Sequence, residues 1–151
     1  MSEQKLRTYA LRPIGTARIR DDNFKIEIID TDISATPFCI YAFLVDDEVV
    51  RVGSTQHPLR IRMRQWERDV SRAMKGQKSP TRAEEVVIWR ELLPDGKYAH
   101  IFARPGTCAH TPVGLLNCYR IEEEALIREF QPRLCWDRGR YKRMAISEIS
   151  G

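Results

Sequence analysis

Residues 39–55 read CIYAFLVDDEVVRVGST, and this stretch decides the fold. The apolar run Cys39–Val45 predicts a buried strand, and Glu48–Val52 predicts a second strand. The dipeptide Asp46-Asp47 between them suits a tight turn. The two strands are therefore expected to form an antiparallel hairpin, which Gly53 ends.

Downstream of the hairpin, the sequence predicts a helix from Pro58 to about Lys75. Proline suits the first turn of a helix. Apolar residues recur there at spacings of three and four and define one buried stripe, namely Leu59, Met63, Trp66, Val70 and Ala73. A second helix is expected to begin with Ser79 as its N-cap and to stop at Pro94.

The remaining elements complete an α/β pattern. Residues 98–103 predict a third main strand, and a loop rich in Gly, Pro and Thr leads to a last helix over residues 116–130. Upstream, residues 15–20 and 24–29 predict two short strands around a turn. The expected architecture is α/β, with a small, mostly antiparallel central sheet flanked by helices and an N-terminal β extension.

Length and composition fit a single soluble domain. The chain has 151 residues, of which 42% are hydrophobic and 30% charged. No apolar run approaches the roughly 20 residues that cross a bilayer, and the N-terminus lacks an apolar secretory segment. We therefore expect a cytoplasmic protein without a membrane partner. Its four scattered cysteines should be free, mostly buried thiols, and a zinc site at Cys108 and His110 lacks the usual paired spacing.

The net charge of +4 is modest, but its distribution is uneven. Residues 58–78 carry five arginines and two lysines against two acidic residues, and a second basic cluster follows Pro132. The two clusters either converge on one face to track phosphates or are two solvated surfaces, and composition leaves both interpretations open. The expected nucleic-acid contacts are Arg60, Arg64, Arg68, Arg133 and Arg138.

Glu123 stands out by its position on the last predicted helix. At about 100° per residue, it falls in the middle of the face formed by Tyr119, Leu126, Ile127 and Phe130. A carboxylate on an apolar face is costly unless it is paired, protonated or bound to metal. Glu123 is therefore either a metal ligand or one half of a structural ion pair, whereas Glu122 and Glu124 point to the sides.

Arg62 and Tyr41 are the other unusual positions. Arg62 flanks the apolar stripe of its helix, where a guanidinium can reach into a cleft and offer a planar fork to a phosphate. Alternatively, it only covers the sheet with its apolar stem. Tyr41 lies inside the first core strand and by itself would be an ordinary core tyrosine.

At these residues the chain resembles the GIY-YIG nuclease family. Cys39-Ile40-Tyr41 stands where the family has Gly-Ile-Tyr, and Arg51-Val52-Gly53 where it has Tyr-Ile-Gly. The run from Gly53 to Arg62 resembles the passage into the family's arginine-bearing helix, and residues 123–135 resemble its closing pattern. The resemblance covers residues 38–139, which leaves residues 1–37 as an N-terminal extension with extra strands and residues 140–151 as a peripheral tail.

The resemblance implies a hydrolytic site. Tyr41 would activate or orient the attacking water, Arg62 would hold the scissile phosphate, and Glu123 would ligate Mg²⁺ or Mn²⁺. Arg51, Cys39 and Cys135 depart from the family's pattern, in which tyrosine, glycine and asparagine stand at these positions. Arg51 either binds phosphate in place of the tyrosine or marks a catalytically inactive descendant.

The sequence thus leads to a metal-dependent DNA endonuclease with catalytic residues Tyr41, Arg51, Arg62 and Glu123. The alternative is a catalytically impaired nucleic-acid-binding module on the same fold, and a protein-interaction domain is the third interpretation. DNA of unknown sequence or structure is the expected partner, and the protein is expected to be a monomer or a homodimer.

Overall fold

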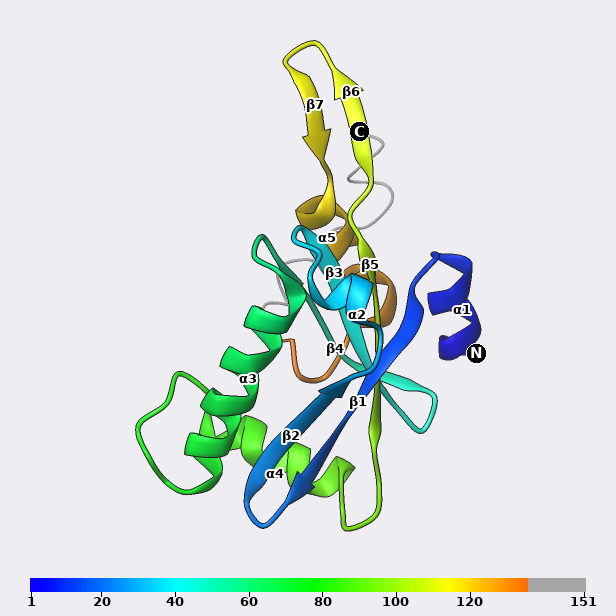
Figure 1. Cartoon of the computed structure of the whole chain (residues 1–151). Helices are drawn as coiled ribbons and strands as arrows, with labels where there is room; N and C mark the ends of the chain where they lie inside the picture. Colours follow the sequence, from blue (N-terminus) through cyan, green and yellow to red (C-terminus); the bar gives the residue numbers. More distant parts are fainter. Residues whose placement is uncertain (136–151) are drawn as a thin grey trace.

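The computed structural model describes residues 1–135 of the 151-residue chain, so Arg138 and the tail at 140–151 lie outside the described residues. Its elements are arranged around one main sheet (Figure 1). In chain order they are α1 (Ser2–Thr8), β1 (Arg12–Arg20), β2 (Asn23–Ile28), α2 (Thr31–Ser34), β3 (Cys39–Val45), β4 (Glu48–Thr55), α3 (Leu59–Met74), α4 (Ala83–Leu92), β5 (Ala99–Pro105), β6 (Cys108–Thr111), β7 (Gly114–Asn117) and α5 (Tyr119–Phe130).

The main sheet has five strands in the order β2-β1-β5-β3-β4, and every neighbouring pair is antiparallel. This confirms the predicted α/β class with an antiparallel central sheet. Strands β1 and β2 from the N-terminal segment form one edge of this same sheet, and β4 forms the other edge.

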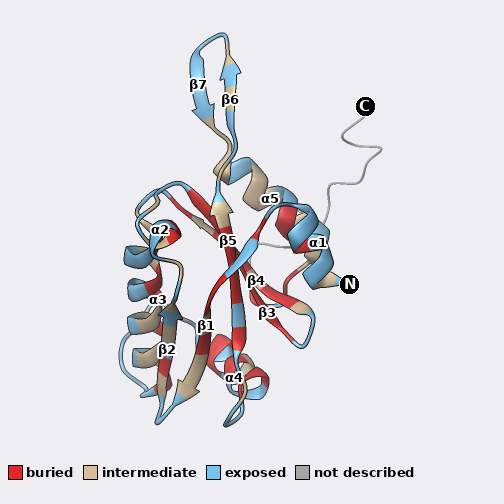
Figure 2. Ribbon diagram, turned by 45° about the vertical axis from the view of Figure 1, so that its right-hand side comes forward, coloured by how far each residue is buried: buried red, intermediate tan, exposed pale blue. Residues whose placement is uncertain are grey.

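The two faces of the sheet carry separate apolar clusters. One face packs on α3 and α4 through residues such as Trp66 and Trp89, and the other packs on α1 and α5 through Leu6, Leu126 and Ile127. Figure 2 shows buried residues concentrated along the central strands β3 and β5. None of the described helices is long and apolar enough to cross a membrane.

The hairpin of β3 and β4 is present as predicted, with one correction. Asp46 and Asp47 both have positive φ, as a two-residue turn with right-handed twist requires. However, Gly53 does not end the second strand, because β4 continues to Thr55 and Gly53 pairs with Tyr41. A glycine inside this strand marks a close approach rather than a strand end.

The helix α3 confirms the predicted helix to within one residue at each end, whereas α4 begins later than predicted. Ser79 does not cap α4, which starts at Ala83. The Ser79 hydroxyl instead donates to the carbonyl of Asp69 and accepts from the amide of Thr81, so it closes a turn between the two helices.

The segment before the last helix was predicted as a loop, and this was wrong. Strands β6 and β7 form a separate two-stranded hairpin that projects from the body of the molecule (Figure 1). Because residues 114–117 pair with residues 108–111, α5 begins at Tyr119 rather than Leu116. The short helices α1 and α2 were not predicted either.

Candidate active site

Tyr41 lies over Gly53 on the face of the sheet that α3 covers. The two residues are cross-strand partners on β3 and β4, and the tyrosine is only 1% exposed. A Cβ atom at position 53 would lie 2.5 Å from the Tyr41 hydroxyl oxygen. Glycine is therefore required at position 53 because the tyrosine ring occupies the space of a side chain.

Arg51 lies on the same face of β4 and is held on several sides. Its guanidinium carbon is 4.7 Å from the ring centroid of Trp66, and its Nη1 donates to the carbonyl oxygen of Leu134 at 2.8 Å. The same Nη1 lies 3.7 Å from a carboxylate oxygen of Glu85. Its Nε is buried and makes no hydrogen bond within the described residues. Arg51 thus links the edge strand to the segment that follows α5.

Arg51 and Arg62 line one cavity of about 320 Å³ at the junction of β4, α3 and the start of α4. The walls of this cavity also include the acidic side chains Asp69 and Glu85 and the cation Arg82. The lining residues do not include Tyr41 or Glu123. The structure therefore brings the two arginines together, with Trp66 of α3 packed against the Arg51 guanidinium.

Glu85 is a buried carboxylate that the sequence analysis missed. It is 4% exposed and belongs to the buried stripe of α4, which continues with Trp89 and Leu92. These three residues are spaced as on one face of a helix. The sequence pattern alone could therefore have indicated that Glu85 is buried. From the sequence alone, Glu85 is also one of two adjacent acidic residues near a helix start, which is a common place for an exposed carboxylate.

Glu123 approaches β4 from the opposite face, where α5 packs on the edge strand. It is half-buried, and its Oε1 accepts a hydrogen bond from Ser54 Oγ at 2.6 Å. Burial raises the pKa of the Glu123 carboxyl, and the Ser54 hydrogen bond and the charge of Arg51 offset only part of that effect. The predicted apolar face of this helix is present, with Leu126 and Ile127 buried.

The candidate residues thus converge on the outer edge of the sheet from both of its faces. Tyr41, Arg51 and Arg62 lie on the side of α3, and Glu123 lies on the side of α5 next to Ser54. The charge of Arg51 acts on the Glu123 carboxyl and lowers its pKa in part, so the two sides are electrostatically coupled. They meet at the edge strand β4, which carries Arg51, Gly53 and Ser54.

Glu122, which helix geometry places to the side of the apolar face, is not a simple solvated carboxylate. It forms a two-point ion pair with Arg104, with 2.7 Å between Arg104 Nη2 and Glu122 Oε2. It also accepts from the amide and the hydroxyl of Thr107. Although burial alone would raise it, the pKa of Glu122 is lowered by these hydrogen bonds. Neighbouring glutamates on α5 therefore have pKa values shifted in opposite directions.

Cys135 bonds to the edge strand. Its Sγ lies 3.3 Å from both the amide nitrogen and the carbonyl oxygen of Val52, and the amide of Leu134 donates to Val50. The segment after α5 therefore runs along part of the open edge of β4. All four cysteines are free thiols, as predicted, although Cys108 is exposed.

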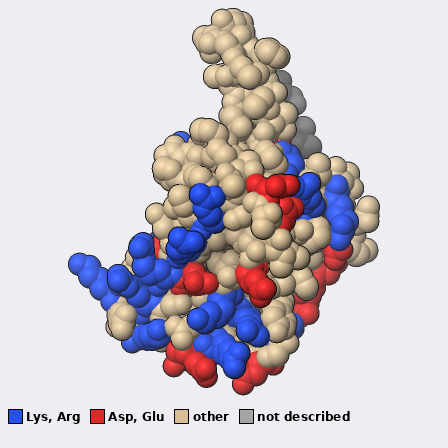
Figure 3. Space-filling model, viewed as in Figure 1, with Lys and Arg blue, Asp and Glu red and all other residues tan. Residues whose placement is uncertain are grey.

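The predicted nucleic-acid contacts differ in their surroundings. Arg60, Arg64 and Arg68 are exposed on α3, and Arg68 Nε lies 3.5 Å from a carboxylate oxygen of the adjacent Asp69. In contrast, Arg133 forms a two-point ion pair with Glu48, which raises its pKa. Figure 3 shows the Lys and Arg side chains gathered over α3 and over the lower end of the sheet.

The carboxylate donors near the site bear on the kind of divalent metal that it could bind. Within residues 1–135, no three His, Cys, Asp or Glu side chains are grouped so that they could hold a metal ion by themselves. A single carboxylate is compatible with Mg²⁺, which binds through one or two carboxylates together with waters and substrate phosphates. Glu123, which accepts from Ser54 on the edge strand, would supply this contact.

Replacing Glu123 by glutamine is expected to stabilise the metal-free protein. The pKa of Glu123 is higher in the folded protein than in the unfolded chain. The free energy of unfolding therefore falls as pH rises from the unfolded pKa through the folded pKa of this group. Glutamine removes the buried charge and keeps an oxygen that can accept from Ser54. Thermal melting without divalent metal should show a higher Tm for Glu123→Gln at about pH 8 and no difference near pH 4, where the wild-type carboxyl is largely protonated. A lower Tm for the variant at the higher pH would contradict this interpretation.

Comparisons with known proteins agree on the fold. No protein-family model matches the sequence, and no curated protein is significantly similar to it. Among solved structures, the chain is similar to a mutant of EndoII from bacteriophage T4, with a TM-score of 0.63 and 18% identity over 88% of this chain and 97% of that one. It is also similar to the restriction endonuclease HPY188I in complex with product DNA, with a TM-score of 0.51 and 13% identity over 96% of this chain and 83% of that one. The chain therefore has the fold of solved nucleases.

Proposed function

We propose that the protein is a metal-dependent DNA endonuclease of the GIY-YIG type, acting in the cytoplasm. The observation that carries the proposal is the meeting of Arg51 and Arg62 in one cavity beside β4, while the half-buried Glu123 of α5 accepts from Ser54 on the opposite face of the same strand. A phosphodiester needs cationic groups to neutralise the charge that develops during cleavage. The nuclease fold supports DNA as the substrate.

Each residue has a physical role in this proposal. Arg62 offers its fork of N–H donors to the scissile phosphate in the cavity. Tyr41 lies over Gly53 without a side chain between them, and its hydroxyl orients the attacking water. Glu123 would hold the divalent ion, and Mg²⁺ or Mn²⁺ bound there would supply Lewis-acid stabilisation of the charge on the phosphate.

Arg51 contributes positive potential and does not relay a proton. A guanidinium stays protonated at any physiological pH, so it cannot replace a tyrosine in proton transfer. Its Nη1 is already bonded to Leu134 and its plane is covered by Trp66. Arg51 therefore acts as a fixed cation at the cavity wall and adds to the field that Arg62 provides.

Nicking of a supercoiled plasmid tests the proposal. The purified wild-type protein should convert supercoiled DNA to the open-circular form in the presence of Mg²⁺ or Mn²⁺, and excess EDTA should stop the reaction. A single site in a monomer nicks, whereas double-strand cleavage requires a homodimer or two sequential events. Open-circular product that forms equally with EDTA would contradict the metal-dependent assignment.

A catalytically impaired DNA-binding module is the second candidate, and the engagement of Arg51 and Cys135 in structural contacts favours it. This candidate predicts gel-shift binding of DNA without metal and without nicking. Its affinity should fall linearly, in logarithmic terms, with salt concentration. Binding without any nicking under all metal conditions would favour this candidate over the endonuclease.

A further inference from the structure

The outer face of the β1–β2 hairpin is a part of the sheet that the described helices leave uncovered. On this side of the sheet α5 packs on β4 and β3, and α1 packs on β4, whereas β1 and β2 form the opposite edge. The opposite face of the same hairpin contributes Ala17 and Phe24 to the core under α3 and α4. The hairpin is therefore firmly anchored on one side and open on the other.

Cations oppose one another on this open face. Arg18 on β1 is the cross-strand partner of Lys25 on β2, and Arg20 is the next residue of β1 on the same face. Within residues 1–135, none of these three side chains forms an ion pair. Like charges directly opposite each other in an antiparallel pair destabilise the sheet. An anion bound across the two strands would remove this repulsion.

Tyr98 fixes the first of these cations. The Arg18 guanidinium carbon lies 5.7 Å from the Tyr98 ring centroid, and Nη1 donates to the tyrosine hydroxyl at 3.1 Å. A guanidinium held against an aromatic ring loses less side-chain freedom when it binds a phosphate. Arg18 is therefore preorganised, whereas Arg20 and Lys25 are exposed and adjustable.

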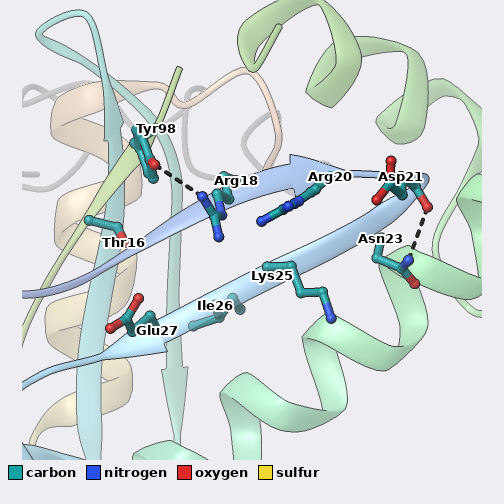
Figure 4. Close-up of a pocket in the computed structure, with 9 residues that line it drawn as sticks. All are labelled: Thr16, Arg18, Arg20, Asp21, Asn23, Lys25, Ile26, Glu27 and Tyr98. Atoms are coloured by element: carbon teal, nitrogen blue, oxygen red, sulfur yellow. Dashed lines mark hydrogen bonds between the residues drawn. The ribbon is translucent and has the colours of Figure 1, made fainter. Parts of the chain in front are cut away.

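The surface is hollowed rather than flat. The three cations, together with Tyr98, line a hollow of about 630 Å³. Figure 4 shows the cations lying along the hairpin between Glu27 at one end and Asp21 at the other. The two carboxylates limit the basic stretch to the middle of the hollow, so an extended anion would contact the hollow over a short length.

We propose that this hollow, lined by Arg18, Arg20, Lys25 and Tyr98, is a second DNA-contact surface that binds the phosphate backbone of a segment outside the cleavage cavity. The hollow and the cavity of Arg51 and Arg62 share no residue and lie at opposite edges of the sheet. A chain of closely spaced phosphates matches a row of cations, and a two-stranded ribbon is narrow enough to follow a groove of duplex DNA. The inference rests on the proposed function only for DNA as the partner.

The test compares two triple variants that lose the same charge. One variant carries Arg18→Gln, Arg20→Gln and Lys25→Gln, and the control carries Lys5→Gln, Arg7→Gln and Arg12→Gln, which are exposed cations outside the hollow. Binding of a fluorescent duplex is measured without metal between about 50 and 200 mM salt. The hollow variant should bind about tenfold more weakly or worse, and its log affinity should depend on log salt with a slope shallower by about 2 to 3. The control should stay within about threefold of the wild type.

Nicking kinetics separate this inference from the proposed function. The hollow variant should raise KM for plasmid and leave kcat unchanged, because none of its three residues lines the cleavage cavity. Equal affinity and equal salt slope for the hollow variant and the wild type would overturn the inference and leave the endonuclease assignment intact. Wild-type binding that depends on the hollow but produces no nicking would overturn only the endonuclease assignment. Equal weakening by both triple variants would indicate a net-charge effect and overturn the inference.

Discussion

Glu123→Ala is expected to lower the rate of metal-dependent nicking by about 100- to 1000-fold, the range seen when one preorganised group that stabilises a developing charge is removed. Glu123 is the carboxylate at the edge strand that would hold the ion, and the only hydrogen bond it receives comes from Ser54 within the described residues. Alanine would remove the proposed metal contact without adding bulk. Single-turnover nicking of plasmid at saturating protein measures the effect on chemistry directly.

The neighbouring Glu124→Ala provides the matched control, because it removes a carboxylate of the same type from the next position of α5. This control should nick at a rate within a few-fold of the wild type. DNA binding without metal should be unchanged in both variants. Nicking by Glu123→Ala at the wild-type rate would show that another carboxylate holds the ion, and the buried Glu85 would be the next to replace.

Gly53→Ala is expected to reduce nicking by about 100-fold, the loss that a misplacement of about 1 Å can cause at an active site. The added methyl group would lie 2.5 Å from the Tyr41 hydroxyl oxygen, so the ring has to move. Repacking of this kind typically costs about 1 to 3 kcal/mol of stability. The fold should survive, and urea unfolding together with the nicking rate would measure the two effects separately.

Gly76→Ala is the control for this change. Gly76 follows α3 with a φ of +71°, and an added Cβ would meet nothing within 4 Å. Alanine there costs backbone strain and should leave the nicking rate unchanged. If Gly53→Ala nicked as fast as Gly76→Ala, the placement of Tyr41 over position 53 would be irrelevant to catalysis.

Local patterns predicted the elements that carry the candidate site. The hairpin of β3 and β4 and the helix α3 depend on short-range features, namely an apolar run, a two-residue Asp turn and an apolar stripe. Likewise, the position of Glu123 on an apolar face follows from helix geometry alone, and the half-buried side chain agrees with it. These inferences needed no knowledge of distant contacts.

Long-range contacts explain what the sequence did not reveal. The first turn of α1 is capped by Asp47, which accepts from the amides of Ser2 and Glu3 across more than 40 residues of chain. The hydrogen bond between Ser54 and Glu123 joins residues 69 positions apart. No local pattern indicates either partner, because each contact exists only once the sheet has formed. The role of Arg51 as a structural link was hidden for the same reason.

The projecting hairpin of β6 and β7 contains no Lys, Arg, Asp or Glu, and no charged atoms are visible on it in Figure 3. The chain leaves and re-enters the body at one place, where the amide of Cys118 donates to the carbonyl of Thr107 at 2.7 Å. The ion pair of Glu122 and Arg104 fastens the body just below that point. A segment whose two ends are joined in this way can lengthen at little entropic cost, since each doubling of the length of a loop costs only about 0.6 kcal/mol. The hairpin is therefore a position where evolution can insert or exchange sequence while β5, α5 and the edge strand keep their places.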